Sequence, residues 1–225
     1  MLIILGFISM ICETNAYTNT IHPKKYIALT FDDGPDEKTT PLLLDILKAK
    51  NSHATFFMIG KNIQQLSGIV KRVYDEWNTI GNHTRDHISI KWLSSQKIIY
   101  QIQKTQKMIK KITWYTPILF RPPYGAQNGK TLNILRISHL PSIQRSLDSN
   151  DWKLPSSKVV VQEIMDKVHP WSIILMHDTL SWTIEAMPQI IDALQNSGYT
   201  LITVDKLLWG SKYIHPGKIY RKSAY

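Results

Sequence analysis

The chain has 225 residues, of which 43% are hydrophobic and 20% are charged. This length and composition predict one globular domain and exclude a disordered or low-complexity protein. Lys and Arg number 27 against 17 Asp and Glu, so the formal net charge is +10. Such a surface favours anionic partners, for example an acidic wall polymer or an anionic lipid. The sequence contains no Arg-rich arm or nucleic-acid-binding motif, and we expect no nucleic-acid partner.

The N-terminal residues 1–16 are predicted to be a signal peptide. Residues 2–12 form an apolar run that has the length of a signal-peptide core and is too short to span a bilayer, and Ala16 offers a small residue for cleavage. The alternative is a retained N-terminus that engages a membrane. Because Cys12 is the only cysteine, the cleaved chain would have no disulfide. Because of the predicted signal peptide, we expect a secreted or extracytoplasmic protein. Residues 17–24 would then be an N-terminal extension.

The first predicted strand, residues 26–29, leads into two adjacent carboxylates. Asp32 and Asp33 follow the apolar run, and Gly34-Pro35 ends the strand. Ligands of α/β folds bind at the carboxyl ends of the strands, which makes this pair a candidate site. The alternative is an ordinary turn with solvated carboxylates. The residues alone do not distinguish the role of Asp32 from that of Asp33.

Strands and helices alternate along the rest of the chain. A helix is predicted to begin at Thr40, which would cap it, with Pro41 in its first turn. Pro188 is expected to interrupt the last long helix. Later helices are predicted at residues 62–77, 95–112, 129–137, 159–168 and 183–196, and later strands at residues 54–59, 79–82, 117–120, 142–147, 171–176 and 199–204. Seven strands, each followed by a helix, predict an α/β fold with a closed or nearly closed barrel in a single domain.

Two histidines follow the predicted strand at residues 79–82. The spacing of four between His83 and His87 predicts that both rings lie on one side of a helical turn, where they could share a cation. Together with a carboxylate from the Asp32-Asp33 pair they would form a site with open positions, which suits a catalytic divalent metal. Zinc is the expected metal, with cobalt, nickel or manganese as alternatives. Surface placement of the two rings by chance is the other interpretation.

Two further strand ends carry candidate catalytic groups. Arg121 precedes a rigid Pro122-Pro123 loop, in which the Tyr124 amide could stabilise an oxyanion, and Arg121 could keep one Asp ionised. An ordinary loop with a surface Arg is the alternative. His177 follows the apolar residues 171–176, where it suits proton transfer, and Asp151 is a plausible partner that would raise its pKa.

Five segments, in this order and spacing, resemble the polysaccharide deacetylase family, also called carbohydrate esterase family 4 or the NodB homology domain. They are residues 30–35, 83–87, 121–125, 148–152 and 175–177. The resemblance covers residues 25–208, the predicted catalytic domain, and leaves residues 209–225 as a basic tail. It implies a distorted (β/α) barrel with about seven strands, a bound divalent metal and removal of acetyl groups from sugar polymers.

The resemblance also implies a role for each matching residue. Asp33, His83 and His87 resemble the metal ligands, and Asp32 resembles the general base. In the same pattern Arg121 orients Asp32, the Tyr124 amide forms the oxyanion hole, and Asp151 tunes His177 as general acid. The acetyl pocket would be lined by Trp152 and Leu175, with Pro122 and Tyr124 beside the substrate. The chain departs from the pattern at Gln144-Arg145, where many relatives carry a tryptophan upstream of the Asp148 segment.

We therefore expect a metal-dependent, monomeric N-deacetylase that releases acetate from polymers containing N-acetylglucosamine, such as peptidoglycan or chitin-like chains. An O-acetyl xylan esterase with the same site is one alternative. A catalytically silent carbohydrate-binding protein is the other. Trp92 and Trp182 could stack on sugar rings if they are exposed, or could be buried in the core.

Overall fold

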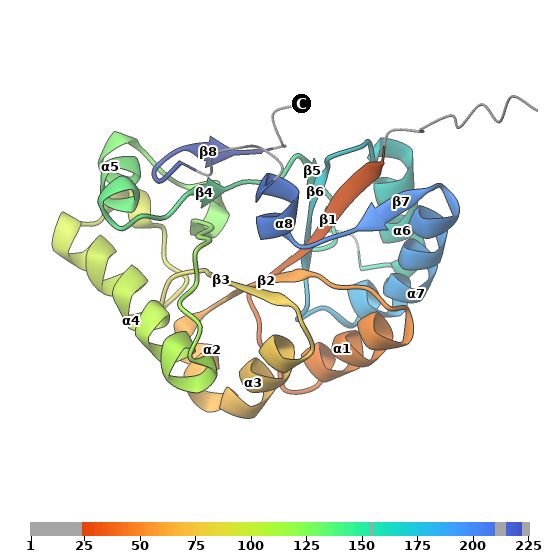
Figure 1. The fold of residues 1–225 in the computed structure, drawn as a ribbon, viewed down its shortest axis with the longest axis horizontal. Coiled ribbons are helices and arrows are strands. Elements are labelled where there is room, and N and C mark those ends of the chain that lie inside the picture. Colours follow the sequence, from red (N-terminus) through yellow and green to blue (C-terminus); the bar gives the residue numbers. More distant parts are fainter. Residues whose placement is uncertain (1–23, 154, 210–214, 222–225) are drawn as a thin grey trace, which may run out of the picture.

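The computed structural model describes residues 24–153, 155–209 and 215–221. The predicted signal peptide at residues 1–16, nearly all of the 17–24 extension and most of the 209–225 tail lie outside the described residues. The described chain forms a mostly parallel sheet with helices packed around it (Figure 1), so the predicted α/β class is confirmed. In this part of the chain no helix combines the length and apolarity needed to cross a membrane.

The sheet is built around β1 (Lys25–Asp32), all of whose strand pairings are parallel. On one side β1 pairs with β2 (Thr55–Met58) and β2 with β3 (Thr79–Asn82). On the other side lie β6 (Ile173–His177) and β5 (Leu147–Asp148), while β7 (Tyr199–Leu201) pairs with the start of β1. The strands β4 (Ser142–Ile143) and β8 (Ile219–Tyr220) form a second parallel pair. Single bridges from Phe120 to Asn82 and Ser142 connect the two sheets into one arc.

The register between β1 and β6 determines where the site lies. Asp32 is paired with His177, and both are the last residues of their strands. Side chains alternate along β1, so Ile27, Leu29 and Phe31 lie in the core beneath the helices while Asp32 lies on the opposite face. Parallel pairing therefore brings two groups 145 positions apart in the sequence to one edge of the sheet.

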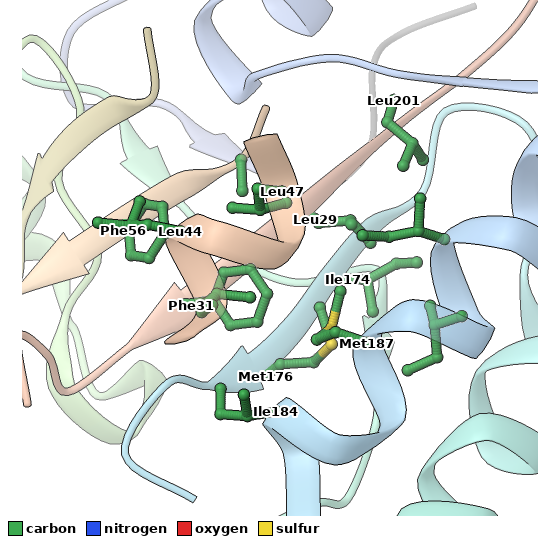
Figure 2. Close-up of a cluster of buried hydrophobic side chains, with 14 of the residues drawn as sticks. Leu29, Phe31, Leu44, Leu47, Phe56, Ile174, Met176, Ile184, Met187 and Leu201 are labelled. Carbon is green, nitrogen blue, oxygen red and sulfur yellow. The ribbon is translucent and has the colours of Figure 1, made fainter. Parts of the chain in front are cut away.

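A layer of helices covers the outer face of the sheet (Figure 1). The described chain contains the helices α1 (Thr39–Ala49), α2 (Gly60–Gln65), α3 (Ser67–Asp75), α4 (Ser95–Thr113), α5 (Gly129–Ile137), α6 (Ser157–Lys167), α7 (Ser181–Asn196) and α8 (Val204–Trp209), with 3-10 turns η1 (Ile90–Trp92) and η2 (Pro123–Gly125). Of these, α8 packs on the other face of β1, where Val204 and Leu207 cluster with Ala28. The largest hydrophobic cluster fills the space between sheet and helices. Figure 2 shows Phe31 and Phe56 from the sheet packed near Leu44 of α1, and Met176 near Met187 of α7. This rigid core holds the strand ends in place.

Several predicted boundaries are wrong, and so is the predicted interruption of the last long helix. Residues 117–120 form no strand beyond the bridges at Phe120, and the strand expected at residues 142–147 is divided into β4 and β5. The helix expected at residues 62–77 breaks at Leu66, whose φ of −119° and ψ of 42° lie outside the helical region. α7 continues through Pro188.

The start of α1 also differs from the prediction. Lys38, not Thr40, is the N-cap residue and makes no side-chain capping bond, while the Asp36 carboxylate accepts a 2.9 Å hydrogen bond from the Thr39 N–H. The Thr40 hydroxyl instead donates to Asp178 at 2.6 Å. Thr40 thus links α1 to the residue that follows His177.

Candidate active site

A cavity of about 430 Å³ opens at the carboxyl ends of β1, β3, β5 and β6. It is lined by all the predicted site residues except Asp151, together with four that the sequence did not single out for the site. The complete lining is Asp32, Asp33, His83, His87, Arg121, Pro122, Tyr124, Gly125, Gln144, Arg145, Asp148, Trp152, Leu175 and His177.

Three of these residues form a group that could hold a metal ion. One ligand atom each from Asp33, His83 and His87 lies within 4.8 Å of the other two. Asp33 Oδ1 is 3.0 Å from His87 Nε2 and 3.4 Å from His83 Nε2, yet it is buried and has no hydrogen bond within the described residues. Three electron-pair donors that converge on one point fit a divalent cation. Burial works to raise the pKa of Asp33, but the two histidines outweigh it and hold that pKa well below its usual range.

The loop that carries the two histidines fixes their ring orientations. The Nδ1–H of His83 donates to the Arg121 carbonyl oxygen at 2.7 Å, which leaves Nε2 facing Asp33. The His87 ring packs against Tyr124, with 4.8 Å between ring centroids. The predicted helical turn is wrong, because Thr84 and His87 have φ values of 66° and 53°. The Gln101 side chain holds the loop by accepting hydrogen bonds from two of its backbone N–H groups.

Asp32 lies beside this group but is held differently. It is 5% exposed and accepts a 2.7 Å hydrogen bond from Arg121 Nη1, which also donates to the Thr30 hydroxyl at 2.8 Å. Arg121 is itself only 3% exposed and its guanidinium lies 4.1 Å from the centre of the Phe57 ring. The alternative of an ordinary surface Arg is therefore wrong. A buried guanidinium of this kind fixes the orientation of its partner carboxylate.

On the strand next to Asp32, His177 is paired with Asp151. His177 Nδ1 donates to Asp151 Oδ1 at 2.8 Å, and the His177 backbone N–H donates to Oδ2 at 2.7 Å. Burial lowers the pKa of His177, but the hydrogen bond and charge of Asp151 outweigh it, and Asp32 and Asp33 add to them, so that the pKa rises to about 9. His177 is therefore protonated at neutral pH and can donate a proton from Nε2.

The predicted substrate-binding residues lie at the mouth of the cavity. Leu175 and Pro122 are buried in its wall, whereas Tyr124 is 72% and Trp152 is 56% exposed. Tyr124 has a φ of 59° in the turn after Pro122-Pro123. The Lys153 ammonium lies 4.4 Å from the centre of the Trp152 ring. Exposed rings beside a polar cavity are suited to packing against sugar rings.

Sequence reasoning missed the residues that support the catalytic groups. Trp182 Nε1 donates to the Asp151 carbonyl oxygen and the Thr183 hydroxyl donates to Asp151 Oδ2, both at 2.8 Å. Thr30 supports Arg121, and its place two residues before Asp32 on the same strand face was a usable signal. No sequence signal pointed to Thr183. Of the two tryptophans considered for sugar stacking, Trp92 is 78% exposed, whereas Trp182 is only partly exposed and holds the Asp151 loop.

Comparison with known proteins identifies relatives of the chain. A family model described as polysaccharide deacetylase matches residues 19–140. The peptidoglycan-N-acetylglucosamine deacetylase PgdA of Listeria monocytogenes is 39% identical over 196 residues, which cover 87% of this chain and 41% of that protein. The chain thus spans about two fifths of the length of this relative.

Solved structures agree with the sequence matches. The T48 deacetylase, solved with substrate, superposes with a TM-score of 0.84 at 38% identity, covering 88% of this chain and 96% of that one. A pseudoenzyme of carbohydrate esterase family 4 from Bacillus anthracis has a TM-score of 0.78 at 34% identity, and the match covers 82% of this chain and 66% of that one. Both folds contain the same α/β arrangement. By its sequence, its fold and the match over residues 19–140, this chain belongs to the polysaccharide deacetylase family.

Proposed function

We propose that the protein is a metal-dependent deacetylase that hydrolyses the N-acetyl groups of polymers containing N-acetylglucosamine, such as peptidoglycan or chitin-like chains, and releases acetate. The observation that carries the proposal is the juxtaposition of three separate groups in one cavity. These are the Asp33, His83 and His87 cluster, the Asp32–Arg121 ion pair and the His177–Asp151 pair.

The three groups divide the chemistry of amide hydrolysis among them. A divalent cation held by Asp33, His83 and His87 would polarise the acetyl carbonyl and acidify the attacking water. Asp32, held in place by Arg121, takes the proton that the water loses as the water oxygen bonds to the carbonyl carbon. In our proposal the Tyr124 amide donates to the oxygen that gains negative charge.

Collapse of the intermediate requires a proton on the departing nitrogen. His177 lies across the β1–β6 pair from Asp32 and is protonated at neutral pH. It gives its Nε2 proton to the nitrogen as the carbon–nitrogen bond breaks, which leaves an amine on the sugar and acetate in the cavity. Leu175 and Trp152 are proposed to enclose the acetyl methyl group.

The resemblance and the donor set support zinc as the metal, with cobalt, nickel or manganese as the alternatives. We further propose that residues 25–208 form the catalytic domain, that residues 1–16 are removed on export, and that the mature protein acts as a monomer outside the cytoplasm. The apolar residues 2–12 and the polymeric nature of the proposed substrate support this location.

Acetate release measured on a panel of acetylated glycans tests the proposal. We expect release from peptidoglycan fragments or chitooligosaccharides, loss after treatment with a chelator, and recovery when zinc or another divalent metal is restored. Acetylxylan in the same assay tests the esterase alternative. A metal-loaded protein that binds the glycans but releases no acetate from any of them would refute the proposal in favour of a silent binding protein.

A further inference from the structure

One wall of the cavity carries hydrogen-bond donors that the protein itself leaves unsatisfied. Gln144 is 7% exposed, lines the cavity, and its side-chain Nε2 is buried without a partner among the described residues. Arg121 also lines this wall, and its Nη2 is likewise buried without a hydrogen-bond partner among the described residues. Its other donors are satisfied, because Nε donates to the Ile143 carbonyl oxygen and Nη1 to Asp32. Buried donors are nearly always satisfied in folded proteins. Both donors belong to residues that line one cavity, so this wall has hydrogen-bonding capacity that the described residues do not use.

Arg145 places a positive charge beside these donors. It lines the cavity and is 42% exposed, and its Nε donates to Asp148 Oδ2 at 2.7 Å. Gln144 and Arg145 both lie against Gly125. A Cβ added to this glycine would be 3.1 Å from Gln144 Oε1 and 3.8 Å from Arg145 Nη1. The amide and the guanidinium thus belong to the same part of the wall.

The carboxylates near this wall are already paired. Asp32 is bound to Arg121 and Asp148 to Arg145, and the remaining acidic residue of the lining, Asp33, belongs to the histidine cluster. No unpaired acidic side chain among the described lining residues would repel an incoming anion. Arg145 binds Asp148 through Nε, and its Nη1 lies toward Gly125. A guanidinium can bind a carboxylate through parallel N–H groups.

We propose that Gln144 and Arg145 form a subsite for a carboxylate carried by the substrate, so that the protein prefers acidic acetylated glycans to neutral ones. This inference rests on the proposed deacetylase function and narrows its substrate class. Among N-acetylglucosamine-containing polymers, peptidoglycan carries a lactyl carboxylate on every second sugar where no peptide is attached, whereas chitin-like chains carry none. The subsite therefore favours the peptide-free stretches of peptidoglycan strands.

A matched pair of oligosaccharides tests the subsite. The first is a peptidoglycan tetrasaccharide with free lactyl carboxylates, and the second is the same tetrasaccharide with each carboxylate converted to a neutral methylamide. We expect kcat/KM for acetate release to be about fivefold to tenfold higher for the acid, as for one partly exposed charge-assisted hydrogen bond. The ratio should fall to about one in Arg145→Gln and take an intermediate value in Arg145→Lys, which keeps the charge but not the planar donor pair.

The control variant is Arg136→Gln, which removes an equal charge from α5, outside the cavity lining, and should leave the ratio unchanged. An acid-to-amide ratio near one in the unmodified protein, or an unchanged ratio in Arg145→Gln, would overturn the subsite. The dissociation constants of both tetrasaccharides are also measured on the His177→Ala variant. Because binding does not depend on turnover, these constants test the subsite separately from the deacetylase function. Preferential binding of the acid without acetate release from either sugar by the unmodified protein would retain the subsite and refute the deacetylase function.

Discussion

Replacing Asp151 by Asn changes the charge beside His177 while nearly preserving its shape. The carboxylate accepts hydrogen bonds from the His177 ring and backbone at 2.8 and 2.7 Å. Burial lowers the pKa of His177, and it is mainly Asp151 that raises this pKa to about 9. An Asn at this position can still accept from the ring but has no charge. The pKa of His177 should therefore fall to its ordinary value of about 6.5 or below.

The size of the effect follows from this difference in pKa. An imidazole with a pKa of about 9 is about 97% protonated at pH 7.5, whereas one with a pKa of about 6.5 is about 10% protonated. The fraction of enzyme with a competent general acid should thus drop about tenfold at pH 7.5, and the loss should shrink as the pH approaches 6. The shift in pKa corresponds to about 3 kcal/mol of interaction with the imidazolium.

The assay is the pH profile of kcat/KM for acetate release, measured on both proteins at equal metal content. The alkaline limb should move to lower pH in Asp151→Asn. Thr183→Val is the matched control, because it removes a 2.8 Å hydrogen bond to the same carboxylate but leaves its charge. A uniform loss of activity at every pH, with the limb in its original place, would refute the role of Asp151 in setting the acidity of His177.

The His177–Asp151 pair also contributes to folding stability. The raised pKa of His177 determines how this contribution changes with pH. Since His177 has a pKa of about 9 when folded and about 6.5 when unfolded, its contribution is fully present below pH 6.5 and is lost as the pH rises through about 9. The charge-dependent part of the stability deficit of Asp151→Asn should therefore be largest in acid, as measured by urea unfolding across this range.

Three further substitutions test other parts of the site. His87→Ala should abolish bound metal and acetate release together, as measured by metal analysis and activity after zinc is restored, and full metal content would contradict the ligand role. Arg121→Met should lower the free energy of unfolding in urea by about 3–5 kcal/mol, because it leaves the buried Asp32 carboxylate unpaired; a loss below about 1 kcal/mol would show that the pair is not needed. Gly34→Ala should cost about 1–3 kcal/mol, because the new Cβ would lie 2.3 Å from Asp178 Oδ2. That cost should be smaller in an Asp178→Ala background, and equal costs in both backgrounds would exclude the contact as its cause.

Single strands and helices could be predicted from the sequence, because each depends on the local periodicity of apolar residues. The apolar run before Asp32 and the amphipathic pattern of α4 have the predicted structure. Predictions failed where long-range contacts decide the backbone. The segment of His83 and His87 has helical spacing, but its backbone N–H groups donate hydrogen bonds to Gln101 of α4, and these bonds hold it as a loop. Spacing within the chain could not reveal a contact made by a different helix.

The supporting residues were hidden for the same reason. Thr183 and Trp182 begin α7, and nothing in their own segment indicates that they bind Asp151 from a loop about thirty residues earlier. Gln144 and Arg145 likewise read as part of a strand, although the structure places them on the cavity wall. A residue whose function is to position another becomes recognisable only once the fold brings the two together.

The different roles proposed for Asp32 and Asp33 follow from the end of β1. Thr30 and Asp32 lie two residues apart, so both side chains are on the face where Arg121 Nη1 binds them at 2.8 and 2.7 Å. Asp33 is the first residue beyond the strand, and its φ of 75° turns the chain out of the extended conformation. Its carboxylate consequently faces His83 and His87 instead of Arg121. One strand end thus presents two identical side chains to different partners: the Arg121 guanidinium for Asp32, and the imidazoles of His83 and His87 for Asp33.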